Sequence, residues 1–186
     1  MSYYRELIYH VACSLNGMIA GVQDNLDLFF SPRLCEGPHV DDFLKQIKNY
    51  QTVLMGRRTY EAGYAFGLQP GQIAYPGREH LVFSSQIRLP ADSLVQVFDG
   101  DAVRHVRMLK HQPGGPIWLC GGGALAGSLY QAGLIDRLIL KLNPVVLGRG
   151  VSLLGECMQT AGTGSLKKYQ AYDNGVILLE YQLNNS

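Results

Sequence analysis

The sequence predicts a three-layer α/β fold in which a mostly parallel central sheet carries helices on both faces and ends in an antiparallel hairpin. Short apolar runs alternate with helix-compatible segments along residues 6–142, which is typical of parallel strands joined by helices. The apolar run 117–120 stops at three consecutive glycines and resumes as a helix-compatible segment. Asp173-Asn174-Gly175 separates the last two strand-like segments and is a strong hairpin signal.

Length and charge restrict the classes of protein that the chain can represent. All 186 residues are expected to form one domain, because a chain of about 150 residues already buries roughly 68–70% of its unfolded surface. A formal net charge of +1 gives no electrostatic basis for binding nucleic acid or a membrane surface. Any anion site must therefore be local.

Neither a membrane segment nor a metal site is expected from the sequence. Residues 1–6 lack the features of a signal peptide, and no run reaches the ~18 apolar residues of a spanning helix. We therefore expect a cytoplasmic protein. The cysteines are widely separated, without a histidine at ligand spacing, so we expect reduced thiols and no zinc. They are Cys13, Cys35, Cys120 and Cys157.

The first elements are a strand, a long loop and a helix. Residues 6–13 predict a strand that enters a turn at Asn16-Gly17. Residues 21–39 show no period and predict a loop of the kind that often forms a lid or binding segment. Residues 40–50 predict a helix, because apolar residues recur at three- and four-residue spacing after two acidic residues.

The middle of the chain predicts three strands and a second helix. Residues 52–55 predict a short buried strand, and residues 80–83 and 93–98 predict two more. Residues 101–111 predict a helix. Asp99 or Asp101 is available as its N-cap.

The glycine turn 121–123 is the best candidate for an anion site. Glycine removes the Cβ, so amide groups at the start of the following helix can approach a phosphate closely. Two nucleotide motifs fit only in part. Gly121-x-Gly123-x-x-Ala126 lacks the acidic residue about 20 positions on that the dinucleotide fingerprint requires. Gly122-x-x-x-x-Gly127-Ser128 has serine where a P-loop has lysine. The alternative is a glycine-rich turn without a ligand.

The remaining strands complete the sheet. Residues 136–142 predict a strand that leads through Asn143-Pro144 into a second glycine-rich connection at residues 148–150. Residues 166–172 and 175–183 predict the two strands of the terminal hairpin.

Three predicted parallel strands end in small or polar turns, which should meet at one edge of the sheet. Ligands of open α/β sheets bind beyond the carboxyl ends of the strands. Arginines, hydroxyls and an uncapped helix start gathered there would hold a ligand with several phosphates. The turns are Gly56-Arg57-Arg58-Thr59, Ser84-Ser85 and Gly121-Gly122-Gly123.

Five segments in this order resemble the dihydrofolate reductase superfamily, and in particular its branch with the RibD C-terminal (riboflavin-biosynthesis reductase) domain. The resemblance covers nearly the whole chain and implies a dihydrofolate reductase-like fold. The segments are Ala12-Cys13-Ser14-Leu15-Asn16-Gly17-Met18-Ile19-Ala20, Leu54-Met55-Gly56-Arg57-Arg58-Thr59-Tyr60-Glu61, Phe83-Ser84-Ser85, Gly121-Gly122-Gly123-Ala124-Leu125-Ala126 and Pro144-Val145-Val146-Leu147-Gly148-Arg149-Gly150.

The resemblance implies NADPH as cofactor, with a role for each matching segment. Backbone groups of Ala12 and Ile19 would bind the nicotinamide carboxamide. The first turn, which is Gly56, Arg57, Arg58 and Thr59, would surround the adenosine ribose and the phosphates. Hydroxyls of Ser84 and Ser85 would bind the 2′-phosphate, and an arginine would supply the charge that distinguishes NADPH from NADH. The pyrophosphate would lie against Gly121, Gly122, Gly123, Ala124 and Leu125.

The substrate half of the site departs from both reductase patterns. Folate reductases carry Pro-Trp-x-x-Pro and then a carboxylate, where this chain has Phe29-Phe30-Ser31-Pro32 and then Val40. Riboflavin-pathway reductases carry an acidic residue at the position of Cys120 and an Asp-Asp-Pro segment at Tyr60-Glu61-Ala62-Gly63. The remaining candidates are Asn16, Phe29, Phe30 and Tyr64 for substrate binding, and Asp41, Asp42 or bound water as proton source, with helix capping as the alternative for both acids.

Hydride transfer from NADPH to a small heterocyclic or sugar-derived molecule is the expected activity. The resemblance places 5-amino-6-(5-phosphoribosylamino)uracil first among acceptors. A dihydrofolate reductase and a non-enzymatic NADPH-binding protein of the same fold are the alternatives. A homodimer through the late strands is expected by analogy with the family.

Overall fold

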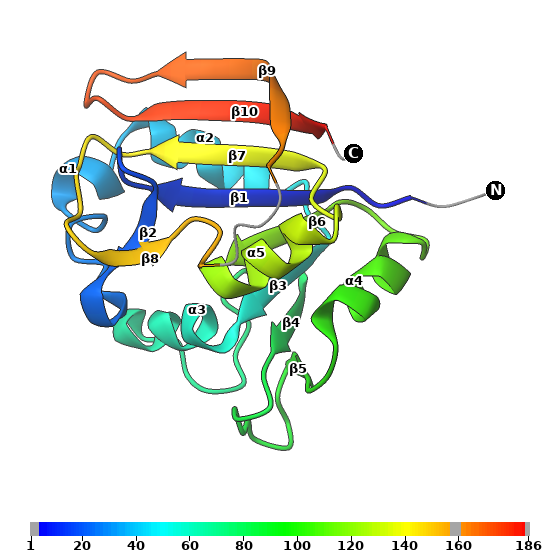
Figure 1. Ribbon diagram of the computed structural model, residues 1–186. Coiled ribbons are helices and arrows are strands. Elements are labelled where there is room, and N and C mark those ends of the chain that lie inside the picture. The colour runs from blue at the N-terminus through cyan, green and yellow to red at the C-terminus, as the bar shows by residue number, and fades with distance from the viewer. Residues whose placement is uncertain (1–3, 157–160, 185–186) are drawn as a thin grey trace.

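An eight-stranded sheet runs through the protein, and the computed structural model describes residues 4–156 and 161–184 (Figure 1). The first six strands in spatial order are parallel, β10 runs antiparallel to them, and β9 pairs antiparallel with β10 at the edge of the sheet. The predicted mostly parallel sheet with a terminal hairpin is therefore confirmed. In spatial order the strands are β5 (Val95–Phe98), β4 (Glu79–Phe83), β3 (Thr52–Gly56), β6 (Ile117–Gly121), β1 (Leu7–Cys13), β7 (Arg137–Leu142), β10 (Ile177–Asn184) and β9 (Thr163–Ala171).

Helices cover both faces of the sheet and make it the middle of three layers. One face packs against α4 (Ala102–Lys110) and α5 (Gly123–Gln131), which contribute Val106, Ala126 and Leu129 to a first core cluster. The opposite face packs against α2 (Pro38–Ile47) and α3 (Arg57–Glu61). In Figure 1, α4 and α5 lie in front of the sheet and α2 lies behind it. Along the central strands, alternate residues belong to the two clusters, for example Leu7 and Ile8 of β1, as the pleat requires.

The segment predicted as a loop, residues 21–39, contains elements that are too short to show a hydrophobic periodicity in the sequence. They are the end of β2 (Met18–Gly21), the 3-10 turn η1 (Val22–Asp24) and the single turn α1 (Pro32–Cys35). β2 pairs antiparallel with β8 (Gly150–Ser152) in a small second sheet that the sequence analysis missed. Strands of three or four residues are too short to show alternation.

Two helix boundaries refine the predictions. α2 begins at Pro38 rather than residue 40 and ends at Ile47, because proline is favoured at the first helical position, where its missing N–H is not needed. Asp101, not Asp99, caps α4: its carboxylate accepts a 3.0 Å hydrogen bond from the Arg104 N–H.

Cys13, Cys35 and Cys120 are free thiols, whereas Cys157 lies outside the described residues.

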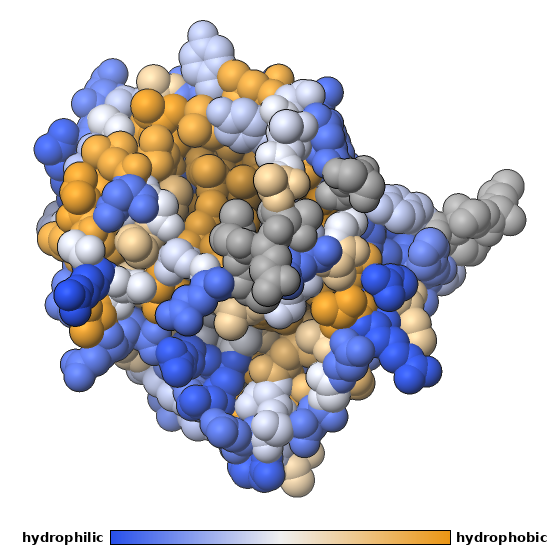
Figure 2. All heavy atoms as spheres, viewed as in Figure 1, coloured by the Kyte–Doolittle hydropathy of each residue, from blue (hydrophilic) through white to orange (hydrophobic). Residues whose placement is uncertain are grey.

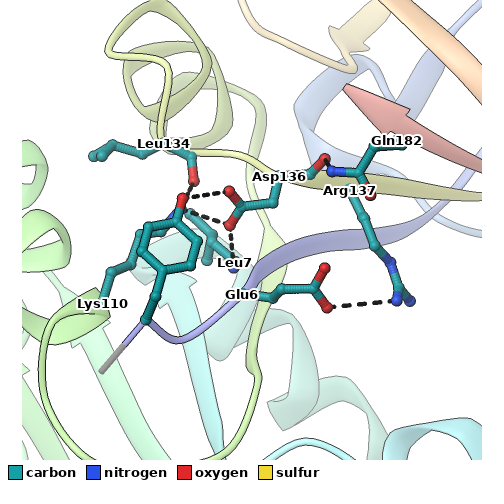
Figure 3. Close-up of polar contacts among 8 residues, drawn as sticks. Glu6, Leu7, Lys110, Leu134, Asp136, Arg137 and Gln182 are labelled. Carbon is teal, nitrogen blue, oxygen red and sulfur yellow. Dashed lines mark hydrogen bonds and ion pairs between the residues drawn. The ribbon is translucent and has the colours of Figure 1, made fainter. Parts of the chain in front are cut away.

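A buried ion pair fixes the amino-terminal ends of the strands, opposite the edge where the predicted turns meet. Lys110 Nζ lies 2.5 Å from Asp136 Oδ2, and its side chain is 2% exposed. Asp136 also accepts hydrogen bonds from the Leu7 N–H and the Tyr4 hydroxyl, at 2.7 and 2.6 Å. Lys110 donates to the Leu134 carbonyl as well (Figure 3). The pair thus links α4 to β1 and to the start of β7.

Candidate functional site

A cavity of about 640 Å³ opens beyond the carboxyl ends of β3, β4 and β6. This volume is in the usual range for small-molecule sites. Arg58, Ser85 and Gly122, one from each predicted turn, all line it. The three turns therefore meet in one place, as expected from the parallel register of β4, β3 and β6.

The glycine turn after β6 leaves the start of α5 without side chains. Gly122 is the N-cap of α5, and no side chain caps this end. Gly121 has a φ of +153°, which favours glycine, and a Cβ built on Gly121 or Gly122 would lie 3.2 Å from Thr59 Oγ1. A Cβ on Gly123 would lie 2.4 Å from the Ser152 carbonyl oxygen of β8. The third glycine is therefore required by packing, and the first two keep the amides open to the cavity.

Both arginines of the α3 turn have acidic partners on the protein. Arg57 lies 2.7 Å from Glu61, one helical turn away, and Arg58 lies 3.7 Å from Asp24 of the loop after β2. The Arg58 side chain is 70% exposed. Exposed ion pairs contribute little free energy, so either guanidinium can exchange its carboxylate for a phosphate at small cost. The Arg58–Asp24 pair also joins the loop to α3 across the cavity.

The serines at the end of β4 belong to the same polar wall. Ser84 Oγ accepts hydrogen bonds from the N–H groups of Gln86 and Ile87, both at 3.0 Å. Its hydroxyl hydrogen remains available as a donor, since a hydroxyl donates one hydrogen bond and accepts others. Ser85 is exposed and lines the cavity beside it.

Another part of the cavity wall is apolar. Met55, Ala74, Tyr75 and Cys120 line it while packing against the second core cluster. Burial raises the pKa of the Cys120 thiol to about 12. The charge that Cys120 would carry as a thiolate, together with burial, raises the pKa of Tyr75 as well. Both groups are therefore protonated and neutral at pH 7.

All predicted cofactor residues except Ala12 line the cavity. Of the predicted substrate residues only Phe30 does so. Phe29 is buried in the core at 7% exposure. Tyr64 packs edge-on against Tyr60. The Asn16 carboxamide is occupied by backbone, because it donates to the Leu147 carbonyl and accepts from the Leu147 N–H. The Asn16 side chain thus joins the turn after β1 to the loop after β7.

Asp41 and Asp42 also lie outside the cavity lining. Asp42 sits on α2, where it accepts a 3.0 Å hydrogen bond from the Tyr172 hydroxyl and lies 3.4 Å from Lys45. The Tyr172 hydrogen bond lowers the pKa of Asp42, which is unfavourable for a proton donor. The structure thus places both acids outside the cavity lining, because α2 covers the sheet face and not its carboxyl edge, and their role as a proton source stays a prediction.

The sequence analysis missed several residues of the cavity wall. Asp24, Leu26, Phe66 and Tyr75 come from irregular or short segments without a period. The ion pair between Arg57 and Glu61 could have been predicted, because opposite charges four residues apart on a helix are neighbours.

Metal ligands and membrane spans were sought along residues 4–156 and 161–184. No group of three or more His, Cys, Asp or Glu side chains in these ranges could hold a metal ion. Within the same residues, no helix has the length and apolar character needed to cross a membrane.

Comparison with known proteins gives a family match and structural neighbours. Residues 5–178 match the family of RibD C-terminal domains. The uncharacterized protein YwjB of Bacillus subtilis (strain 168) is 32% identical over 155 residues, which is 82% of this chain and 84% of YwjB.

Two solved structures illustrate the likeness of fold. Dihydrofolate reductase from Enterococcus faecalis, complexed with NADP(H) and RAB-propyl, superposes with a TM-score of 0.67 at 17% identity, and the match covers 99% of both chains. A diaminohydroxyphosphoribosylaminopyrimidine deaminase/5-amino-6-(5-phosphoribosylamino)uracil reductase from Thermotoga maritima has a TM-score of 0.66 at 13% identity and covers 97% of this chain and 57% of that chain. At these identities the likeness establishes the fold alone.

Proposed function

The chain belongs to the RibD C-terminal domain family, and we propose on this premise that it is an NADPH-dependent reductase of a small heterocyclic or sugar-derived molecule. The meeting of three strand-end turns at one cavity is the observation that carries the proposal. When bound, NADPH supplies a hydride from C4 of its nicotinamide.

The polar wall of the cavity fits a dinucleotide with three phosphates. Open amides at Gly121–Gly123, Ala124 and Leu125 would bind the pyrophosphate at the start of α5, which is nine residues long. Arg57, Arg58, Ser84 and Ser85 would bind the adenosine 2′-phosphate. Ile19 and Thr59 line the cavity and would complete the cradle, while Ala12 would contribute only through its backbone.

The remaining wall positions the acceptor and excludes water. Apolar side chains make up this part of the wall. A site without water helps to hold the reactants in the orientation needed for hydride transfer. The acidic residue of the described lining is Asp24, which is paired with Arg58. We therefore propose that bound water supplies the proton of the reduction; the sequence offered it as a candidate beside Asp41 and Asp42.

Replacing both arginines tests the cofactor assignment. We expect Arg57→Ala/Arg58→Ala to weaken NADPH binding by roughly 10- to 100-fold, the effect of losing charge-assisted hydrogen bonds, and to weaken NADH binding much less. Titration of cofactor fluorescence measures both affinities. Arg104→Ala/Arg107→Ala removes the same charge from the exposed face of α4 and serves as the control. Equal losses for NADPH and NADH would contradict the 2′-phosphate role.

NADPH oxidation against a panel of acceptors tests the activity itself. The panel contains 5-amino-6-(5-phosphoribosylamino)uracil, which the family resemblance favours, dihydrofolate and simple carbonyl compounds. Turnover of dihydrofolate alone would favour the folate reductase alternative. NADPH binding without any turnover would favour the non-enzymatic alternative.

A homodimer through the last strands is the assembly that we propose. No described helix covers the face of β7, β10 and β9 that lies in front in Figure 1, and Figure 2 shows a broad apolar area there. Cross-strand neighbours put Leu140 beside Leu179 and Leu179 beside Tyr169, whose side chain is 70% exposed. A large exposed apolar area on a soluble protein marks an interaction surface. A second copy would cover it by two-fold symmetry.

Sedimentation velocity tests this assembly. We expect the wild-type protein to sediment as a dimer and Leu179→Asp to sediment as a monomer, because the change puts an unpaired charge into the interface. Met108→Asp introduces the same charge at an exposed apolar position of α4 and should stay dimeric. A monomeric wild type would contradict the proposal.

A further inference from the structure

The apolar part of the cavity wall restricts the chemistry of the acceptor. This inference rests on the proposed function as a reductase. Four side chains of this part of the wall pack on the second core cluster, and two aromatic side chains approach from the loop after β2 and from η2 (Ala62–Phe66). These six side chains, which we name the acceptor wall, are Met55, Ala74, Tyr75, Cys120, Phe30 and Phe66.

The acceptor wall carries no cation. Among the described residues that line the cavity, the cations are Arg57 and Arg58, both in the first turn of α3. Both belong to the polar end, beside the glycine turn and the serines. Once the phosphates of NADPH bind these two arginines, no positive charge of the described lining is left for a phosphate group on the acceptor. A phosphate carries a charge of about −1.5 to −2 at pH 7, and burying it without a partner is strongly unfavourable.

Two neutral polar groups remain for hydrogen bonding to the acceptor. Tyr60 is excluded, because its hydroxyl already donates to the Gln72 carbonyl and accepts from the Gly71 N–H, both at 2.9 Å. Tyr75 and Cys120 line the cavity, and a hydroxyl and a thiol can each donate to and accept from a ligand. Both stay protonated at pH 7, so this edge of the wall is polar but uncharged.

The aromatic pair of the wall, whose rings are tilted by 42° to each other, offers exposed ring surface to a ligand. Phe30 and Phe66 have ring centroids 4.4 Å apart, and the side chains are 47% and 60% exposed. Exposed phenylalanines at a cavity mouth leave apolar ring surface for a flat ligand to cover. The two come from separate segments, the loop after β2 and η2, so the wall is assembled only in the folded chain.

We propose that the acceptor of this reductase is an uncharged, planar heterocycle without a phosphate group, bound against Phe30 and Phe66 with its polar edge at Tyr75 and Cys120. This distinguishes the chain from a reductase of a phosphoribosyl substrate, in agreement with the missing acidic and Asp-Asp-Pro positions of its sequence.

The reduction balances with the named reactants. A C=N or C=O carbon of the acceptor takes the hydride, and the π electron pair moves to the nitrogen or oxygen. That atom takes a proton from water, so one C–H bond and one N–H or O–H bond form. The balancing oxidation is that of NADPH to NADP⁺.

Two pairs of acceptors, each with an uncharged and an anionic member, test the inference. One pair is 5-amino-6-ribosylaminouracil and its 5′-phosphate, and the other is dihydrobiopterin and the anionic dihydrofolate. We expect the uncharged member of each pair to have a kcat/KM roughly tenfold higher or more. Binding without turnover is read from Trp118, the single tryptophan, whose ring centroid lies 4.6 Å from that of Tyr75. The uncharged members should quench its fluorescence at lower concentration.

The outcomes separate the inference from the function on which it rests. Failure to bind NADPH would overturn the proposed function. NADPH binding combined with preference for the charged members, equal use of both, or reduction of none of the four would overturn the acceptor class alone.

A charge placed on the acceptor wall provides the second test. Phe66→Arg should raise the kcat/KM of the 5′-phosphate relative to the riboside by roughly tenfold, because it supplies the missing partner. Leu94→Arg adds the same charge at a position that is 70% exposed and outside the cavity lining, and should leave the ratio unchanged. An unchanged ratio in Phe66→Arg would contradict the placement of the acceptor.

Discussion

Lys110→Met should lower the free energy of unfolding by about 3–5 kcal/mol, the usual cost of removing one partner from a buried ion pair. The ammonium of Lys110 lies 2.5 Å from Asp136, and both side chains are buried. After the substitution, the Asp136 carboxylate keeps the Leu7 N–H and the Tyr4 hydroxyl but loses the ammonium group with which it forms an ion pair. Urea unfolding at pH 7, followed by circular dichroism, measures the change.

Two further variants establish the cause. Lys110→Met/Asp136→Leu removes both charges and should recover part of the loss, because the unpaired carboxylate is no longer buried. Lys45→Met breaks the exposed pair with Asp42, in which the lysine side chain is 75% exposed, and should leave the unfolding midpoint unchanged. A Lys110→Met protein as stable as the wild type would show that the buried pair contributes nothing.

Gly122→Asp should weaken NADPH binding by roughly 100-fold, because it places a carboxylate where the cofactor's pyrophosphate would lie. A like charge there replaces favourable charge-assisted hydrogen bonds with repulsion. Gly122 has extended backbone angles that any residue adopts, and its added Cβ meets only Thr59 Oγ1, at 3.2 Å. Aspartate is also a preferred N-cap, so α5 should be at least as stable as before.

The pairing of retained stability with lost affinity identifies the effect as one on binding. Gly148→Asp is the matched control, because its built Cβ has no atom within 4 Å and the residue is exposed. We expect its affinity for NADPH to equal that of the wild type. Cofactor fluorescence and thermal unfolding are measured on all three proteins. Wild-type affinity in Gly122→Asp would show that the glycine turn is not the phosphate site.

The cofactor half of the cavity could be predicted because it depends on strand ends. Each turn follows directly on a buried apolar strand, so the parallel sheet alone brings Arg58, Ser85 and Gly122 to one edge. Strand-like segments and turn signals likewise predicted the sheet and the terminal hairpin, whereas the sequence left Asp99 and Asp101 as alternative caps of α4. The positions of strand ends can be predicted from the sequence because they depend little on packing elsewhere in the protein.

The acceptor half could not be predicted, because it depends on how irregular segments pack. Phe29 and Phe30 are adjacent in sequence, yet one is buried in the core and the other lines the cavity. Asp42 is bound to Tyr172, 130 residues away. No local pattern contains such information, since it arises from tertiary contacts alone.

The buried pair at Lys110 and the cavity occupy opposite edges of the sheet, the first at the amino ends of the strands and the second at their carboxyl ends. Substitutions at well-separated sites have nearly additive effects. Protein engineers could thus reinforce one edge first and then diversify Phe30 and Phe66 in a library, so that gains in thermal tolerance offset the losses that new specificities commonly bring.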